Sequence, residues 1–172
     1  GPIIHPNNAR SILTTAMEHQ LFFLDDYADF SAPRKVLGPP PSPACYPVWA
    51  WYQHMDSKRR KPDLRRAGVL PRGAKGIRVE INKDDKDVLL SDFILWHFPF
   101  SYRSFIGQNE EESMAFEKML EDRGLDTKRL EKLPKDIQDV IIKSWDKTLD
   151  MGFSDPYHTC PKESKSIQAT FW

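Results

Sequence analysis

The sequence predicts an α+β fold, in which a small, mostly antiparallel sheet is covered by three to four helices. Four segments, at residues 47–53, 77–82, 88–90 and 166–172, have the short apolar or alternating patterns of β-strands. The second half of the chain repeats apolar residues at intervals of three and four, which is the spacing of a helix with one buried face. We therefore expect the four strands to form the sheet and the helices to cover it.

Aromatic side chains are concentrated at residues 46–52 (YPVWAWY), where four rings follow a proline-rich run. A covered ring buries roughly 150–250 Å², so this segment is expected to line either the core or the wall of a ligand site. On a strand, Trp49 and Trp51 would share one face. The opposite face would carry Val48, Ala50 and Tyr52. Since both faces are apolar, we predict that both are buried.

Residues 77–82 (IRVEIN) alternate apolar and polar side chains, which predicts a strand with one buried face. The charged residues that follow are typical of a turn, and residues 88–90 (VLL) then predict a short buried strand. Both segments are therefore placed in the sheet.

A first helix is predicted over residues 7–22, where apolar side chains recur on one face. A second helix is expected after residue 90, with Ser91 as its cap and Asp92 at the positive end of its dipole. Pro99 would kink or end this helix. Its shared face would carry Phe93, Trp96 and His97. Asp92 and His97 would point to different faces, so a catalytic pair between them is not expected.

Two further helices are predicted at residues 110–123 and 134–149. Gly124 is placed to cap the end of the first. The side chains expected to point inward from the first are Met114, Phe116, Met119 and Leu120. Those expected to point inward from the second are Ile137, Val140, Ile141, Trp145 and Leu149.

The composition favours one domain, residues 3–172, with Gly1 and Pro2 interpreted as a remnant of a cleaved tag. Basic and acidic residues number 25 each, which argues against binding of nucleic acid or membrane through bulk charge. The two cysteines, Cys45 and Cys160, are too few for a disulfide framework and favour the reducing cytoplasm. No apolar run approaches the ~20 residues of a membrane span, and no zinc-ligand spacing occurs, so neither membrane nor metal is expected.

The loop at residues 55–76 is strongly basic and is interrupted by prolines and glycines. Its Arg65 can hold an anion through the planar guanidinium, and a wall of Trp49, Trp51 and Trp96 can stack a base at roughly 1–3 kcal/mol per base. We therefore expect a nucleotide- or nucleic-acid-binding domain with an aromatic-lined pocket beside a basic loop. The alternative is that the tryptophans are core residues and the loop is merely solvated. Further candidate ligand-binding residues are Tyr46, Asp92, His97 and Gln168.

Five motifs along the chain carry a family resemblance. They are YPVWAWYQ at residues 46–53, KPDLR at 61–65, VLLSDFILWHF at 88–98, KSW at 143–145 and SIQATFW at 166–172. In this combination the chain resembles the bacterial DUF3841 family, a domain of unknown function. Members of that family usually continue past the last tryptophan with a glutamate, so the resemblance implies a glutamate after Trp172.

The order of elements is also similar to that of small ADP-ribosyltransferase-like domains, whose split sheet holds NAD. This similarity implies an NAD-dependent transferase as the alternative function. The catalytic residues would include His5 and either Tyr46 or Tyr52, of which we favour Tyr52. The catalytic carboxylate would be the glutamate after Trp172, so residues 1–172 alone would bind NAD but transfer it poorly.

Overall fold

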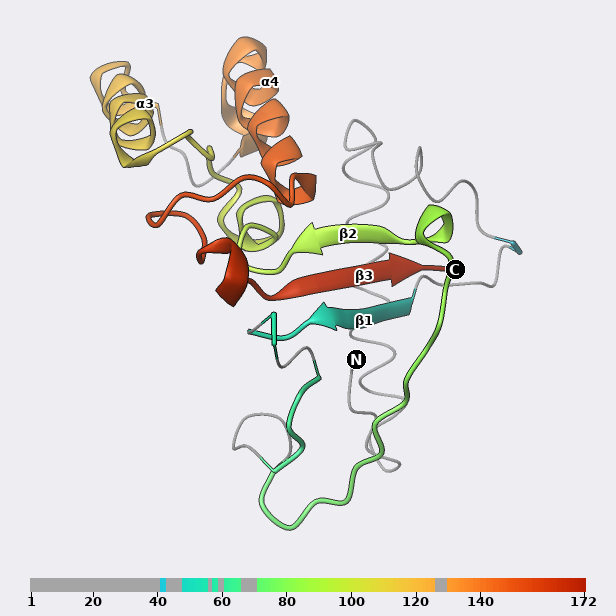
Figure 1. The fold of residues 1–172 in the computed structure, drawn as a ribbon. Helices are drawn as coiled ribbons and strands as arrows, with labels where there is room; N and C mark the ends of the chain where they lie inside the picture. Colours follow the sequence, from blue (N-terminus) through green and yellow to red (C-terminus); the bar gives the residue numbers. More distant parts are fainter. Residues whose placement is uncertain (1–40, 43–47, 56, 59–60, 66–70, 126–129) are drawn as a thin grey trace.

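The computed structural model of the chain describes residues 41–42, 48–55, 57–58, 61–65, 71–125 and 130–172. A three-stranded sheet lies at the centre of this part, and two helices, α3 (Glu110–Asp122) and α4 (Lys135–Ser144), lie to one side of it (Figure 1). The predicted helix at residues 7–22 falls outside the described residues. No helix in the described ranges is long and apolar enough to cross a membrane.

The sheet is antiparallel throughout, as predicted, and its strands follow the order β1 (Val48–Gln53), β3 (Ile167–Phe171), β2 (Leu89–Asp92). The last strand of the chain is therefore the central one (Figure 1). Both edge strands pair with it through the same residue, since Ala50 and Leu90 each lie opposite Ala169. The register of β1 shifts between Trp51 and Gln53, which places a bulge at the end of that strand.

The predicted strand at residues 77–82 is wrong. Residues 76–83, which we call the outer segment, run outside the sheet as a drawn-out connection (Figure 1), and their backbone groups form no hydrogen bonds to other described residues. The side chains of Ile77, Val79 and Ile81 are 82%, 72% and 48% exposed. Alternation determines which side chains share a face, but it does not supply a neighbouring strand for the backbone.

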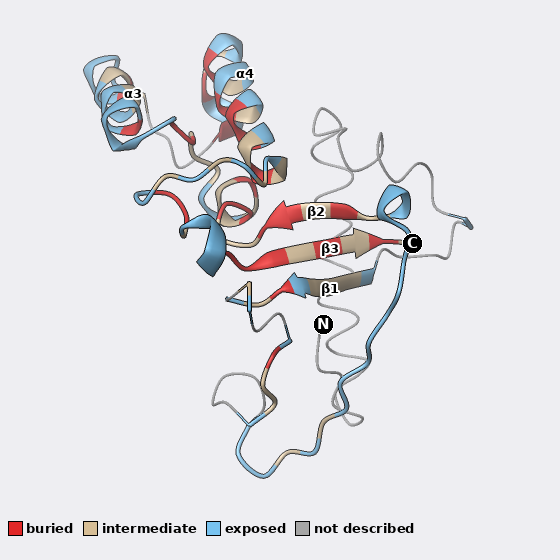
Figure 2. Cartoon of the chain, in the orientation of Figure 1, coloured by how far each residue is buried: buried red, intermediate tan, exposed pale blue. Residues whose placement is uncertain are grey.

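The core lies between the sheet and the helices, and its fully buried side chains include Leu95, Ile106, Leu120, Ile141 and Trp145. Figure 2 shows buried residues along β2 and β3 and on the inner sides of both helices. The indole of Trp145 is 0% exposed and donates a hydrogen bond of 2.8 Å to the carbonyl of Ser104. The more deeply buried of the two core tryptophans is thus both covered and hydrogen-bonded.

Helix α3 has a well-formed start and end. The side chain of Asn109 accepts the backbone N–H of Glu112 at 2.9 Å, which satisfies one donor of the first turn. Gly124 adopts a φ of +65°, and the N–H groups of Gly124 and Leu125 bond to the carbonyls of Glu121 and Leu120. This pattern is a Schellman motif, and it confirms the predicted glycine cap.

The prediction is wrong for two of the side chains expected to point inward, because buried serines occupy the inner faces of these helices instead. Met114 is 57% exposed and Val140 is 45% exposed. Ser113 and Ser144 are buried instead, and each hydroxyl accepts a buried backbone N–H, from Gly107 and Ile106 respectively. A serine is polar, so the sequence alone places it on the exposed face of a helix. Here each serine has a hydrogen-bond partner in another segment, and this partner allows the serine to lie on the buried face. The other predicted inward positions, Phe116, Met119, Leu120, Ile137, Ile141, Trp145 and Leu149, are at least partly buried against the core.

Candidate functional site

One face of the sheet forms the floor of a cavity of about 680 Å³. Ala50, Leu90 and Ala169 lie directly opposite one another across the three strands, so their side chains share this face. Phe171 completes the floor. Two alanines at the centre of the face leave room that larger side chains would fill.

The outer segment forms one wall of the cavity, and Lys61 and Pro62 extend it. The ammonium group of Lys61 lies 2.7 Å from both carboxylate oxygens of Glu80, and a guanidinium nitrogen of Arg78 donates to the carbonyl of Pro62 at 3.2 Å. The hydrogen bond and charge of Lys61, with a smaller contribution from Arg78, lower the pKa of the Glu80 carboxyl. Glu80 is therefore ionised at neutral pH, and its contacts with Lys61 and Arg78 connect the two parts of the wall.

Lys83 provides a positive charge at the end of the cavity. Its ammonium nitrogen lies 5.4 Å from the centroid of the Phe171 ring and donates a hydrogen bond of 2.8 Å to the backbone oxygen of Trp172. No side-chain carboxylate among the described residues lies within ion-pair distance of it. Because an ammonium group has three donors, two of them remain for a ligand.

Tyr52 lines the same cavity from β1, and its side chain is 44% exposed. The prediction that Tyr52 and Ala50 share a face is consistent with this placement. The prediction that both faces of β1 are buried is wrong, because Val48 is 42% exposed as well. The face opposite the core is therefore only partly covered, since Ala169 and Phe171 are buried on it while Val48 and Tyr52 are exposed.

The predicted tryptophan wall lies mainly on the core side of the sheet. The rings of Trp49 and Trp96 meet edge to face at 5.1 Å, and Trp96 is buried. Trp51 meets Phe93 in the same manner at 5.0 Å. Trp49 and Trp51 do share a face, as predicted, but that face packs against the core, with only Trp51 also contributing to the cavity lining.

Arg65 lies in the loop next to Lys61 and is held by Asp63. Two guanidinium nitrogens of Arg65 lie 2.9 and 2.8 Å from the two carboxylate oxygens of Asp63, and this pairing raises the pKa of Arg65. The Arg65 side chain is 89% exposed and does not line the cavity. It can reach a ligand at the edge of the site only if Asp63 releases it.

Asp92 lies inside the protein and caps the turn that follows β2. One of its oxygens accepts the backbone N–H groups of Ile94 and Leu95, and the other accepts the hydroxyl of Thr159 at 2.6 Å and lies 3.0 Å from the ammonium of Lys165. The predicted helix after residue 90, with Ser91 as its cap, is wrong, because β2 continues through Asp92 and residues 93–96 form turns. A short π-helix (Phe98–Tyr102) follows, and Pro99 lies in its first turn instead of ending a helix. Asp92 is 0% exposed, so no ligand reaches it in this conformation.

The remaining candidate residues are dispersed. His97 is half-buried and bonds through Nδ1 to the carbonyl of Phe93 at 2.9 Å. Gln168 lies opposite Trp51 and Ser91, which places it on the tryptophan face rather than on the cavity floor. His5 and Tyr46 lie outside the described residues.

A buried Ser–His–Asp arrangement was not predicted. The hydroxyl of Ser113 lies 2.7 Å from Nε2 of His158, and Nδ1 of the same ring lies 2.6 Å from a carboxylate oxygen of Asp155. These distances match those of a nucleophile, base and orienting acid. Only the spacing of Asp155 and His158, three residues apart in one turn, gives a signal in the sequence.

This arrangement is structural rather than catalytic. Ser113 is 5% exposed and His158 is 4% exposed, so a substrate cannot reach the hydroxyl. The same hydroxyl already accepts the N–H of Gly107, and a Cβ at Gly107 would lie only 2.6 Å from it. The cluster therefore fastens three segments of the chain together. Among the described residues, no group of three or more His, Cys, Asp or Glu side chains is arranged to hold a metal ion.

Comparison with known proteins identifies the family. A search of curated proteins and a search of solved structures each found no similar protein. A family model for a domain of unknown function, DUF3841, matches residues 4–172 and so includes all three strands and both helices. With that match, the chain belongs to the DUF3841 family.

Proposed function

We propose that the cavity above the face of the sheet opposite the core binds a nucleotide. Its volume of about 680 Å³ is that of a small-molecule site. The exposed ring of Tyr52 offers a surface on which a base can stack. The positive charges of Lys61, Arg78 and Lys83 along the other side suit a phosphate group.

The single observation that carries this proposal is the position of Lys83. Lys61 and Arg78 are both engaged with Glu80, so a phosphate would have to compete for them. Lys83 has no such carboxylate side chain beside it among the described residues, and the Phe171 ring beneath it holds its charge at the end of the cavity. A phosphate placed there would meet two available donors of Lys83 while the base lies toward Tyr52.

Calorimetric titration tests the proposal. We expect ADP to bind, adenosine to bind more weakly, and Lys83→Met to remove most of that difference, at about tenfold in Kd, because a charge-assisted hydrogen bond contributes about 1.5–3 kcal/mol. The matched control is Lys118→Met, which removes an exposed lysine on α3 and should leave binding unchanged. Equal affinity for ADP and adenosine would contradict a phosphate site.

A second measurement with ADP tests whether Arg65 contributes to binding. If the basic loop assists binding, Arg65→Ala should weaken ADP binding by an amount that shrinks as salt is raised, since exposed charges are screened over about 10 Å at 0.1 M. The stability of the fold should not change, because the ion pair with Asp63 is exposed. A loss of stability with unchanged affinity would instead make Arg65 a structural residue of its loop.

The alternative is an NAD-dependent ADP-ribosyltransferase-like enzyme. One observation favours it: Tyr52 and the end of β3 at Phe171 line the same cavity. A glutamate after Trp172 would then be available to stabilise the positive charge that develops on the ribose as nicotinamide leaves. An assay of nicotinamide release, on this chain and on one extended past Trp172, separates the two proposals. Binding of NAD without release from either protein would leave the binding domain as the better account.

A further inference from the structure

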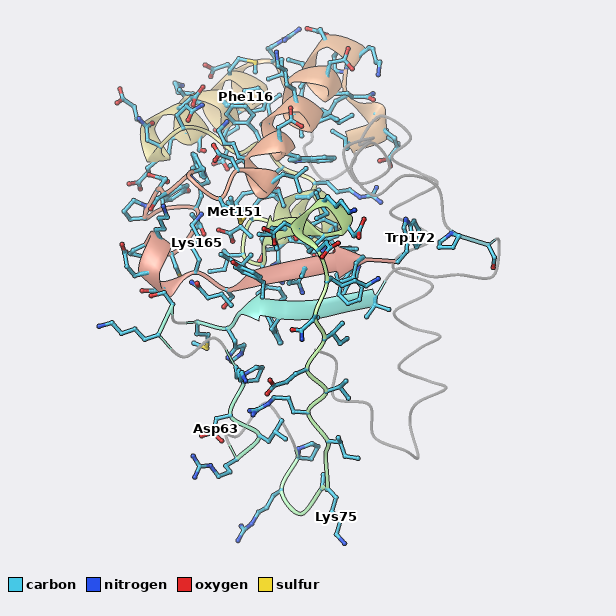
Figure 3. The ribbon with its side chains drawn as sticks, turned by 45° about the vertical axis from the view of Figure 1, so that its right-hand side comes forward. Asp63, Lys75, Phe116, Met151, Lys165 and Trp172 are labelled. Carbon is cyan, nitrogen blue, oxygen red and sulfur yellow. The ribbon has the colours of Figure 1, made fainter. Side chains whose placement is uncertain are left out.

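The outer segment combines exposed apolar side chains with backbone groups that have no hydrogen-bond partner in the part of the chain that the structure describes. Ile77, Val79 and Ile81 project from it with most or half of their surface in water. The backbone N–H and C=O groups of residues 76–83 form no hydrogen bonds to other described residues. Figure 3 shows the segment rising from the tip of its loop, near Lys75, with side chains on either side. A segment of this kind is a template for strand pairing.

The sequence of this segment is complementary to itself when two copies run antiparallel. With Val79 opposite Val79 of a second copy, Ile77 lies opposite Ile81. In the same register Arg78 lies opposite Glu80, and Glu80 opposite Arg78. Facing residues of an antiparallel pair lie on the same side, so one face of the ribbon is wholly apolar and the other carries two pairs of opposite charges.

We propose that the outer segment pairs with the outer segment of a second copy of this chain, forming a symmetric dimer. The contact is isologous, because each chain presents residues 77–81 to the same residues of its partner. Backbone hydrogen bonds hold the two segments together, as in peptide recognition by strand addition. The pairing ends beyond these residues, since Lys75 would meet Lys83 and like charges opposite each other are unfavourable.

The charge pattern favours a second copy over an unrelated peptide. Arg78 and Glu80 lie side by side on the segment, with a guanidinium nitrogen 3.6 Å from a carboxylate oxygen, so a partner strand would meet both charges on one side, where it would compete with Lys61 for Glu80. An incoming strand must bring the opposite order of charges and apolar residues at every second position. The antiparallel copy of residues 77–81 meets both requirements. The dimer needs no nucleotide, so this inference does not rest on the proposed function.

Analytical ultracentrifugation over a range of protein concentrations tests the dimer. The chain should pass from monomer to dimer as its concentration rises. Arg78→Glu and Glu80→Arg should each weaken the dimer by about tenfold in Kd, because each puts two like-charge pairs into the ribbon. The matched control is Arg72→Glu, a charge reversal at an exposed position outside the paired residues, which should leave the dimer unchanged.

An equimolar mixture of the two charge-reversal variants gives the decisive result. Arg78→Glu in one chain faces Glu80→Arg in the other, and the unchanged Glu80 of the first chain faces the unchanged Arg78 of the second, so the mixed dimer regains both opposite-charge pairs. We expect a heterodimer as stable as the original dimer. A chain that stays monomeric at all concentrations, variants that dimerise as well as the original, or a mixture that stays monomeric would each overturn the proposal.

Discussion

Lys165 and Asp92 form an ion pair in which neither side chain has any exposed surface, with the ammonium nitrogen 3.0 Å from a carboxylate oxygen. The pair joins the end of β2 to the stretch of chain that leads into β3. Figure 3 shows Lys165 near the start of the central strand. Phe153 also accepts a hydrogen bond from the ammonium group, and Thr159 donates to the carboxylate. The charges are thus buried, but their polar atoms are satisfied.

Asp92→Asn should destabilise the fold strongly. The substitution keeps the shape but leaves the charge of Lys165 buried without its partner, which costs about 3–5 kcal/mol. The matched control is Asp63→Asn, which breaks an exposed pair with Arg65 and should cost far less, because exposed ion pairs are screened by solvent. Urea denaturation measures the loss of stability in both variants. Similar losses would show that the buried Asp92 pair stabilises the fold no more than the exposed Asp63 pair does.

Ser113→Ala should loosen the junction between α3 and the loop that carries His158. It leaves the N–H of Gly107 and Nε2 of His158 without their partner, at a cost of about 1–3 kcal/mol. The exchange of the Gly107 amide should become faster in the same variant. Ser101→Ala, at an exposed position, is the control and should change neither quantity. Slow exchange at Gly107 in Ser113→Ala would show that another group holds that amide.

Gly124→Ala tests the end of helix α3. The residue has a φ of +65°, and nothing lies within 4 Å of an added Cβ, so any loss of stability comes from backbone strain alone. A side chain in this left-handed conformation costs roughly 1–2 kcal/mol. Gly124→Asn should cost less, since asparagine tolerates the conformation better. Thermal unfolding compares the two, and an equal loss would contradict the strain argument.

Lys61→Met should raise the pKa of Glu80. In the original protein the hydrogen bond and charge of Lys61 hold this pKa below its ordinary value of 4.5, so the pair stabilises the fold at pH values above that value. The contribution is lost as the pH falls through the lowered pKa, and the two proteins should then become equally stable. NMR titration of the Glu80 carboxyl carbon measures the shift. Lys86→Met, which removes a lysine paired with Asp84, is the control, and an unchanged Glu80 pKa in Lys61→Met would contradict the assignment.

The elements predicted correctly from the sequence are those specified by residues that lie close together in the chain. The aromatic and β-branched runs that form β1 and β3 lie where they were expected, and so does α3 with its glycine cap. Helix α4 begins where expected but ends at Ser144, and the last five residues of the predicted helix, Trp145–Leu149, form a 3₁₀ helix instead. Each of these depends on periodicity or on a cap within a few residues of the element. The outer segment shows the limit, because its alternation is that of a strand while its pairing partner is absent from the described residues.

The cavity differs from the site that the sequence led us to expect. The expected pocket combined the tryptophans with a basic loop, whereas the cavity is lined by Tyr52, Lys61, Arg78 and Lys83. The sequence identifies which residues share a face of β1, but it cannot show which face meets the helices. The tryptophans were therefore placed on the ligand side, although their size favours the core. The buried partners of Asp92 and Ser113 come from distant segments, which periodicity cannot reveal.

Photolabelling with 8-azido-ADP, followed by mapping of the modified peptide, tests the central claim most directly. The account predicts labelling at Tyr52 or within residues 78–83, which line the cavity, and loss of labelling when unmodified ADP is added in excess. Lys83→Met should reduce the labelling, whereas Lys118→Met should not. Saturable labelling at the tryptophan face instead, or labelling that excess ADP does not prevent, would contradict a nucleotide site in this cavity.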